Sequence, residues 1–327
     1  MSIEVIKPGL LTSLQDAGRR GYAHLGLGRA GAVDEPARRL ANALVGNAGN
    51  AAALEITLAG PTLRFQRDAV VALTGGLIEA RVEGQPLPAW TSCYLPAGSV
   101  LRLGGMRHGC RSYLAVRGGF DGAPVLGSRS SDLHAGVGPL HGKAVQSGEV
   151  IAIGERDAAS WFRPGRSMQA LRWGLDPQPW LDYARAPLAL LRGHHWDALD
   201  DASQQALFTQ RFMVSKDSNR TGHRLEGAPL RLRQPLELIS EATLPGTMQL
   251  PPSGQPIVLL AEAPVTGGYP RIGQLAAVDL PRLAQRRPGD GVFFRETTLD
   301  EALQRLTERE ATLQRLLQRI EQRLESA

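Results

Sequence analysis

The sequence contains few cysteines and no long apolar run. Its two cysteines, Cys93 and Cys110, are too few for a disulfide framework and too far apart for a CxxC centre, so we expect both to be reduced residues of the core. No apolar run approaches the roughly 20 residues that a membrane span requires. The first residues also lack the basic start and apolar run of a secretory leader. We therefore expect a cytoplasmic protein without a membrane partner.

Lysine and aromatic residues are also scarce. Lys7, Lys143 and Lys216 are the only lysines among 37 basic residues, and aromatic residues make up 5% of the chain. The net charge of +5 comes from arginines that are spread along the chain, without the basic block or aromatic platform typical of nucleic-acid binding. We expect no nucleic-acid partner, because scattered arginines serve equally well to bind a small carboxylate or phosphate.

Glycine and proline are abundant, with 37 and 22 residues, and they separate many short β-type runs. Such runs lie at 62–65, 69–74, 78–82 and 112–116 in the first half and at 230–233, 236–239 and 257–261 in the second. Closely spaced short strands favour barrels or sandwiches over alternating βαβ units. The sequence therefore predicts a mainly β fold.

Two helices interrupt this pattern. Asp34 offers an N-cap and Pro36 suits the first turn of a helix whose apolar residues recur at helical spacing as far as Gly46. Near the C-terminus, Thr298 and Glu301 form a capping-box pattern ahead of apolar residues at a 4,3 spacing. The pattern predicts a long helix whose apolar stripe packs on its own barrel or contacts another subunit.

The strand pattern weakens between about 154 and 201, where prolines, tryptophans and arginines accumulate. We therefore predict an N-terminal β-barrel subdomain over 1–160, a linker region over 161–200, a C-terminal β-barrel subdomain over 201–296 and a helix over 297–327.

Familiar nucleotide and metal motifs are incomplete. Residues 26–31 spell GxGxxG, but no hydrophobic strand precedes them as a Rossmann turn requires. Residues 138–144 are one residue short of a phosphate loop and lack its Ser or Thr. No GxSxG elbow occurs, and the adjacent His194 and His195 would point apart rather than at one ion. We expect no metal site on this chain.

Two polar segments are candidates for a ligand site. Residues 215–227 place Arg220 and Arg224 among small turn residues, which suits an anion clamp or a solvated hairpin connection. Residues 249–270 bring the carboxylate of Glu262 and the pair Gly267–Gly268 to the end of a strand. Composition leaves a ligand site and an ordinary strand–turn equally open here.

Ordered sequence blocks along nearly the whole chain carry a family resemblance. The blocks lie at 8–10, 12, 15–19, 31–34, 41–47, 54–55, 112–119, 127–129, 132–133, 218–222, 224–227 and 266–270. With them the chain resembles the family that contains the C subunit of bacterial 5-oxoprolinase, the second subunit of allophanate hydrolase and the carboxyltransferase domain of urea carboxylase.

This resemblance implies a fold and an assembly. Family members contain two cyclophilin-like β-barrel subdomains and work within complexes. Stand-alone bacterial members of this size resemble the component that acts with 5-oxoprolinase subunits A and B, and the expected direct partner is the B subunit. That complex opens 5-oxo-L-proline to L-glutamate and uses ATP and Mg, so both cofactors are expected for the complex. Covalent biotin is not expected, because no lysine lies in the usual Met-Lys-Met setting.

The resemblance also suggests site residues. Glu262 and Tyr269 are the predicted catalytic residues. The predicted substrate-binding residues are Arg220, Arg224, Thr266, Gly267, Gly268, Asp16 and Arg19. Asp16 and Arg19 are expected to form a pair that lines the site or is a buried ion pair.

One block departs from the family pattern. The family usually reads Asp-Ala-Gln-Thr-Thr-Gly-Gly-Tyr where this chain has Glu262, Pro264 and Val265 before the same ending. This change retunes the substrate or leaves the acid with a structural role. Two other functions stay open: the carboxyltransferase half of a biotin-dependent urea or amide carboxylase, and a non-catalytic regulatory binding subunit.

Overall fold

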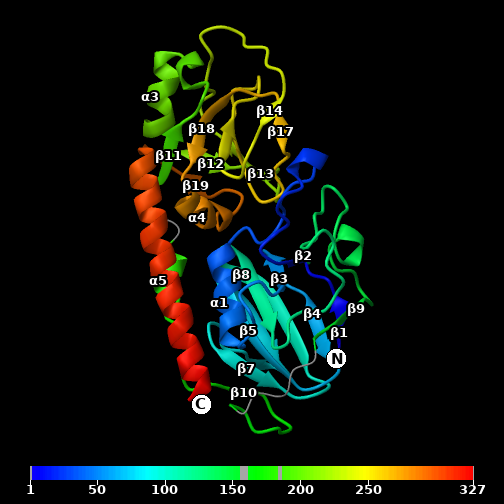
Figure 1. Cartoon of the computed structure of the whole chain (residues 1–327). Helices are drawn as coiled ribbons and strands as arrows, with labels where there is room; N and C mark the ends of the chain where they lie inside the picture. Colours follow the sequence, from blue (N-terminus) through cyan, green and yellow to red (C-terminus); the bar gives the residue numbers. More distant parts are fainter. Residues whose placement is uncertain (1, 155–160, 183–185, 327) are drawn as a thin grey trace. The chain divides into compact units, whose positions relative to one another are not determined.

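The computed structural model describes residues 2–154, 161–182 and 186–326 and is mainly β (Figure 1). Two compact units share the chain. The first unit comprises Met1–Arg19, Asp34–Leu181 and Leu313–Ala327, and the second comprises Arg20–Val33 and Asp182–Thr312. The predicted fold class, mainly β with few helices and a long C-terminal helix, is confirmed.

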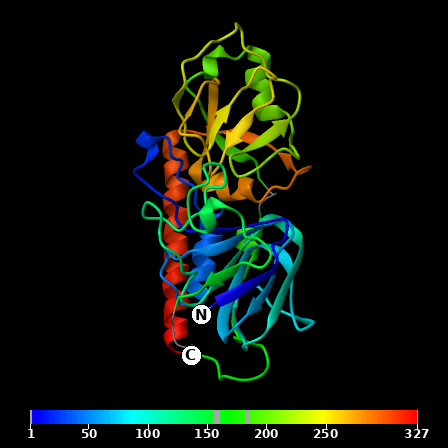
Figure 2. The ribbon, with the colours of Figure 1, turned by 90° about the vertical axis from the view of Figure 1, so that its right-hand side faces the viewer.

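The first unit contains a ten-stranded sheet that curls into a nearly closed barrel. Strands β5 and β8 form its long central pair, seen in cyan as curved ribbons in Figure 2. The side chains that point inward form one apolar core, which includes Leu54, Val71, Leu73 and Leu114. The strands are β1 (Ser2–Lys7), β2 (Leu11–Gln15), β3 (Ala53–Thr57), β4 (Thr62–Phe65), β5 (Ala69–Val82), β6 (Gln85–Pro86), β7 (Ser92–Leu95), β8 (Val100–Val116), β9 (Val150–Ala152) and β10 (Gln169–Ala170).

Helix α1 (Glu35–Leu44) lies against β5 and β8 in the first unit (Figure 1). Asp34 caps it as predicted, since Asp34 Oδ1 accepts a hydrogen bond from the Ala37 amide at 3.2 Å. The apolar face predicted from the spacing is buried, and Thr74 Oγ1 donates to the Ala37 carbonyl at 2.7 Å. The unit also contains α2 (Gln178–Leu181) and the 3₁₀ turn η2 (Leu140–Gly142).

The second unit is built on an eight-stranded sheet in the order β19-β12-β13-β16-β15-β18-β11-β20. A separate two-stranded sheet pairs β14 (Glu241–Ala242) with β17 (Thr266–Gly267). The other strands are β11 (Leu188–Arg192), β12 (Phe212–Val214), β13 (Gly222–Glu226), β15 (Thr247–Gln249), β16 (Ile257–Leu259), β18 (Arg271–Leu275), β19 (Gly291–Val292) and β20 (Phe294–Glu296). The helices are α3 (Asp201–Thr209), α4 (Leu280–Ala284) and the 3₁₀ turns η1 (Ala23–Leu25), η3 (Trp196–Ala198) and η4 (Ala277–Asp279).

Helix α5 (Leu299–Glu325) lies within the predicted range 297–327. The Glu301 amide donates to Thr298 Oγ1 at 3.2 Å, as the capping pattern predicts. The predicted stripe does not pack uniformly: Leu313 and Ile320 are buried, whereas Leu299 and Leu303 are 60% and 51% exposed. Salt bridges hold the early turns instead, because Arg305 donates to both carboxylate oxygens of the buried Asp279 at 3.1 Å.

The two units are not continuous in sequence, unlike the predicted ranges 1–160, 161–200, 201–296 and 297–327. The chain passes from the first unit to the second between Leu181 and Asp182, within the predicted linker. Helix α5 is continuous, but its residues up to Thr312 belong to the second unit and those from Leu313 belong to the first. The segment Arg20–Val33 belongs to the second unit because Val33 packs into that unit's core. This assignment depends on packing between distant segments, which cannot be predicted from a local shift in composition.

Both cysteines are free and buried, as predicted. Burial raises the pKa of the Cys93 thiol to about 12. In the part of the chain that the structure describes, no helix has the length and apolar character to cross a membrane.

Candidate functional site

Arg220 and Glu262 meet in the second unit because they adjoin neighbouring strands. Arg220 precedes β13 and Glu262 follows β16, and the Glu262 amide donates to the Arg220 carbonyl at 3.0 Å. Arg220 Nε donates to Glu262 Oε1 at 2.6 Å, and Arg220 Nη2 donates to the Gly31 carbonyl at 2.7 Å. Both side chains are buried. The carboxylate therefore fixes the arginine, and Glu262 acts as a base only if this ion pair opens.

Arg224 lies apart from this pair. It is exposed on β13, so the structure does not place the two predicted arginines in one clamp. Strand register instead aligns Arg224 with Ile257, Ile257 with Gln249, and Gln249 with Arg271 across four neighbouring strands. Directly opposed residues share a face of a sheet. The next residues, Val258 and Met248, are fully buried in the core, so this row lies on the outer face.

The predicted segment 266–269 lies beside this outer face. Glu241 of β14 opposes Gly267 of β17, and Glu241 accepts a hydrogen bond from Arg271 Nη2. Arg271 Nη1 donates to the Ala242 carbonyl at 3.1 Å. Figure 1 shows β14 and β17 side by side in the second unit. Thr266 and Gly268 are exposed, and Tyr269 is 45% exposed.

Gln249 reaches the same region from strand β15. Its side chain is 5% exposed, and a Cβ built on Gly267 would come within 2.4 Å of Gln249 Nε2. A side chain at 267 would therefore force the Gln249 amide to move. Among the described residues, Gln249 Nε2 and Arg271 Nε find no hydrogen-bond partner although both atoms are buried.

His195 is another titratable residue in contact with Arg271. Its Nδ1 accepts a hydrogen bond from the Arg271 amide at 3.1 Å, and its ring meets the His194 ring edge to face at 4.9 Å. Burial, and then the neighbouring His194, lower the pKa of His195. The predicted site residues Thr266, Gly267, Gly268 and Tyr269 thus lie near Glu241, Gln249, Arg271 and His195, which sequence reasoning did not select. Arg224 lies on the same sheet face but on β13, with β16 and β15 between it and Arg271.

The family model for the carboxyltransferase domain, subdomain A and B, matches residues 25–296. The chain is also 42% identical to the C subunit of Escherichia coli 5-oxoprolinase, over 92% of this chain and 93% of that protein.

The chain belongs to the carboxyltransferase domain family.

Solved structures agree with this family. The chain superposes on K. lactis urea amidolyase with a TM-score of 0.84 and 26% identity, covering 95% of this chain and 20% of that chain. It superposes on TTHA0988 with a TM-score of 0.75 and 36% identity, covering 90% of this chain and 55% of that chain. The family domain thus spans about a fifth of the amidolyase and about half of TTHA0988.

Asp16 and Arg19 precede the matched family residues and lie in the first unit. The predicted pairing between them is wrong. Asp16 accepts hydrogen bonds from Ser128 and Ser130 at 2.6 and 2.5 Å, whereas Arg19 donates to the Ser130 carbonyl at 2.6 Å and faces Asp132 at 3.9 Å. Burial by itself would raise the pKa of Asp16, but the serine hydroxyls and the amides of Arg129 and Gly18 lower it below its ordinary value. The two residues hold the loop 128–132, each through its own partners.

The family blocks at 31–34, 54–55 and 112–119 place a second buried polar group in the first unit. The Asp34 amide donates to Tyr113 Oη at 2.8 Å, and Tyr113 Oη donates to Glu55 at 2.7 Å. Burial, together with the negative charges of Glu55 and Asp34, holds the pKa of Tyr113 well above its ordinary value. These residues therefore join α1 to the barrel, which accounts for three of the blocks structurally.

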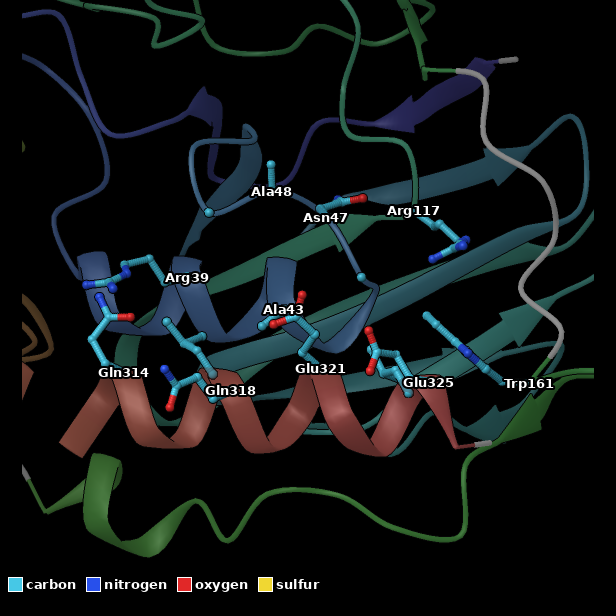
Figure 3. A pocket seen from close by; sticks show the side chains of 14 residues that line it. Arg39, Ala43, Asn47, Ala48, Arg117, Trp161, Gln314, Gln318, Glu321 and Glu325 are labelled. Atoms are coloured by element: carbon cyan, nitrogen blue, oxygen red, sulfur yellow. The ribbon is translucent and has the colours of Figure 1, made fainter. Parts of the chain in front are cut away.

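A cavity of about 560 Å³ in the first unit contains none of the predicted site residues (Figure 3). It lies between α1 with its following loop and the end of α5, with Arg39, Arg117, Glu321 and Glu325 on its walls. The Arg117 guanidinium stacks on Trp161 at 4.6 Å and donates to the Val45 carbonyl at 3.1 Å. The arginine thus stabilises the wall on which it lies.

Proposed function

We propose that this chain is the C subunit of a 5-oxoprolinase, acting with subunits A and B. The supporting observation is the match to the E. coli 5-oxoprolinase component, which extends over 93% of that protein at 42% identity. A relative from Haemophilus influenzae with the same name is 35% identical over 92% of this chain. The extent of these matches leaves little of either relative without a counterpart here.

The proposed reaction is the ATP-dependent opening of 5-oxo-L-proline to L-glutamate. A lactam is a poor electrophile, and phosphorylation of its oxygen by ATP makes the ring carbon more electrophilic. Water adds to that carbon, the ring C–N bond breaks with the nitrogen leaving as the amine, and hydrolysis of the remaining acyl phosphate gives the carboxylate and inorganic phosphate. In the proposal, the outer face of the second unit binds the substrate. Arg271 binds the carboxylate, and Arg224 on the same sheet face adds positive charge that attracts it. Gly267 and Gly268 permit close approach, and Tyr269 offers its exposed hydroxyl.

The buried pair has a supporting part in this proposal. Because Glu262 holds Arg220 at 2.6 Å and both are buried, they position the β13 and β16 ends that flank the outer face. While this ion pair is formed, Glu262 is a positioning residue. Its predicted catalytic role requires the ion pair to open.

ATP and Mg belong to the complex in this proposal. Within residues 2–154, 161–182 and 186–326, no group of three His, Cys, Asp or Glu side chains could hold a metal ion. In this proposal magnesium is bound together with ATP by the complex, and no step is derived through it on this chain. The proposed reaction takes place in the cytoplasm, where ATP is available.

Reconstitution tests the proposal. Glutamate release from 5-oxoproline with ATP and magnesium is measured for subunits A and B, with and without this chain. We expect turnover only in the complete mixture. Stable association with the B subunit without turnover would contradict the proposal and favour a regulatory role.

The superposition on K. lactis urea amidolyase supports a second candidate, a carboxyltransferase half that acts on urea or a related amide with a separate biotin carrier. Transfer of a carboxyl group from carboxybiotin to urea, measured with this chain present and absent, tests it. No transfer above the rate without the chain would exclude this candidate.

A further inference from the structure

Arg271 and its surroundings have the features of a carboxylate-binding subsite in the second unit. Its guanidinium is 25% exposed and is bound by the carboxylate of Glu241, which is itself 41% exposed. Arg271 Nη2 donates to Glu241 Oε2, and a ligand carboxylate would accept from the same guanidinium. Because both members are partly exposed, a soluble carboxylate can compete with Glu241 for Arg271.

Two unsatisfied donors mark the same place. Gln249 Nε2 and Arg271 Nε are buried and have no hydrogen-bond partner among the residues described. Leaving such a donor unpaired costs about 1–3 kcal/mol of folding free energy. Buried donors without a partner are therefore rare in native proteins unless they have a function or bind a molecule. Gln249 and Arg271 are directly opposed on β15 and β18, so the two donors share one face of the sheet.

The strand pair β14–β17 covers these donors. Gly267 lies so close to Gln249 that a Cβ would clash with Nε2 at 2.4 Å, and Arg271 fastens β14 through Glu241 and the Ala242 carbonyl. When Glu241 leaves Arg271, one of the two contacts that Arg271 makes to β14 is lost.

We propose that Glu241 is an internal stand-in for the carboxylate of a small ligand, which displaces it from Arg271 and also receives a hydrogen bond from Gln249. This inference rests on the proposed function for the ligand's identity, 5-oxo-L-proline, but the subsite itself requires only a small carboxylate. Glu241 is therefore autoinhibitory, and Gln249 and Arg271 determine specificity for the carboxylate.

Binding to the full-length chain tests the inference by calorimetric titration with 5-oxoproline and with 2-pyrrolidone, which lacks the carboxylate. Glu241→Gln should tighten 5-oxoproline binding about 2- to 5-fold, because a partly exposed competing ion pair is removed. Gln249→Leu should weaken it about 2- to 10-fold, and Arg271→Lys about 10-fold or more. Binding of 2-pyrrolidone should not respond to Glu241→Gln.

A matched control is Glu296→Gln, which removes a carboxylate paired with Arg192 on the same sheet at 2.5 Å. It should leave both affinities unchanged. The inference is overturned if Glu241→Gln leaves 5-oxoproline binding unchanged or tightens 2-pyrrolidone equally. If the reconstituted complex does not turn over 5-oxoproline but acetate or L-proline binding still responds to Glu241→Gln, the subsite stands and the proposed reaction fails.

Discussion

Removing one member of the Arg220–Glu262 pair leaves the other charge in the protein interior without its partner. Arg220 is 2% exposed, so Arg220→Ala should lower the free energy of unfolding by about 3–5 kcal/mol. Arg224→Ala, four residues along and exposed, should change it by less than about 0.5 kcal/mol. Urea denaturation of the two variants measures both values, and equal losses would contradict the buried pairing.

Asp16 should make stability depend on pH. Its pKa in the folded chain lies below the ordinary value of 3.8, so the carboxylate stabilises the fold above that value and loses this effect as the pH falls through the folded pKa. We expect Asp16→Asn to remove this part of the acid sensitivity. Denaturation at pH 7, 4 and 3 compares the variant with the wild type, and parallel pH profiles would show that Asp16 does not contribute.

The leucines of the 27-residue helix α5 differ in how deeply they are buried. Leu313 is 1% exposed and Leu303 is 51% exposed, although both are leucines of the same predicted stripe. Leu313→Ala should therefore destabilise the protein by about 2–5 kcal/mol, and Leu303→Ala by less than about 0.5 kcal/mol. Thermal unfolding distinguishes them, and comparable losses would show that Leu303 is covered in the folded chain.

The molecule as a whole contains two large apolar cores, one against the ten-stranded sheet and one against the eight-stranded sheet. Leu54 lies in the first core and Leu190 in the second, and both are fully buried. We expect calorimetry to show two unfolding transitions, with Leu54→Ala lowering one midpoint and Leu190→Ala the other. A single transition that both variants lower equally would show that the units unfold together.

Local sequence determined much of this protein. The Asp34 cap, the Thr298 capping pattern and the alternation within short strands depend on neighbouring residues, so α1, α5 and the mainly β class could be predicted. The family could be predicted from ordered blocks in the same way. The segment 266–269 could be selected as a candidate because its residues are consecutive, and the roles assigned to them stay predictions.

Tertiary structure decided which residues meet. Arg220 and Arg224 are close in sequence, yet one is paired with Glu262 in the interior and the other is exposed on the sheet. Gln249 and Arg271 are far apart in sequence but opposed in register, and Asp16 and Arg19 have separate partners on the loop 128–132. Strand register and burial depend on contacts between distant segments, since a shift of one residue turns every side chain to the other face. Local patterns indicated the polar segments, and only the pairing of strands determined which of their side chains lie close together.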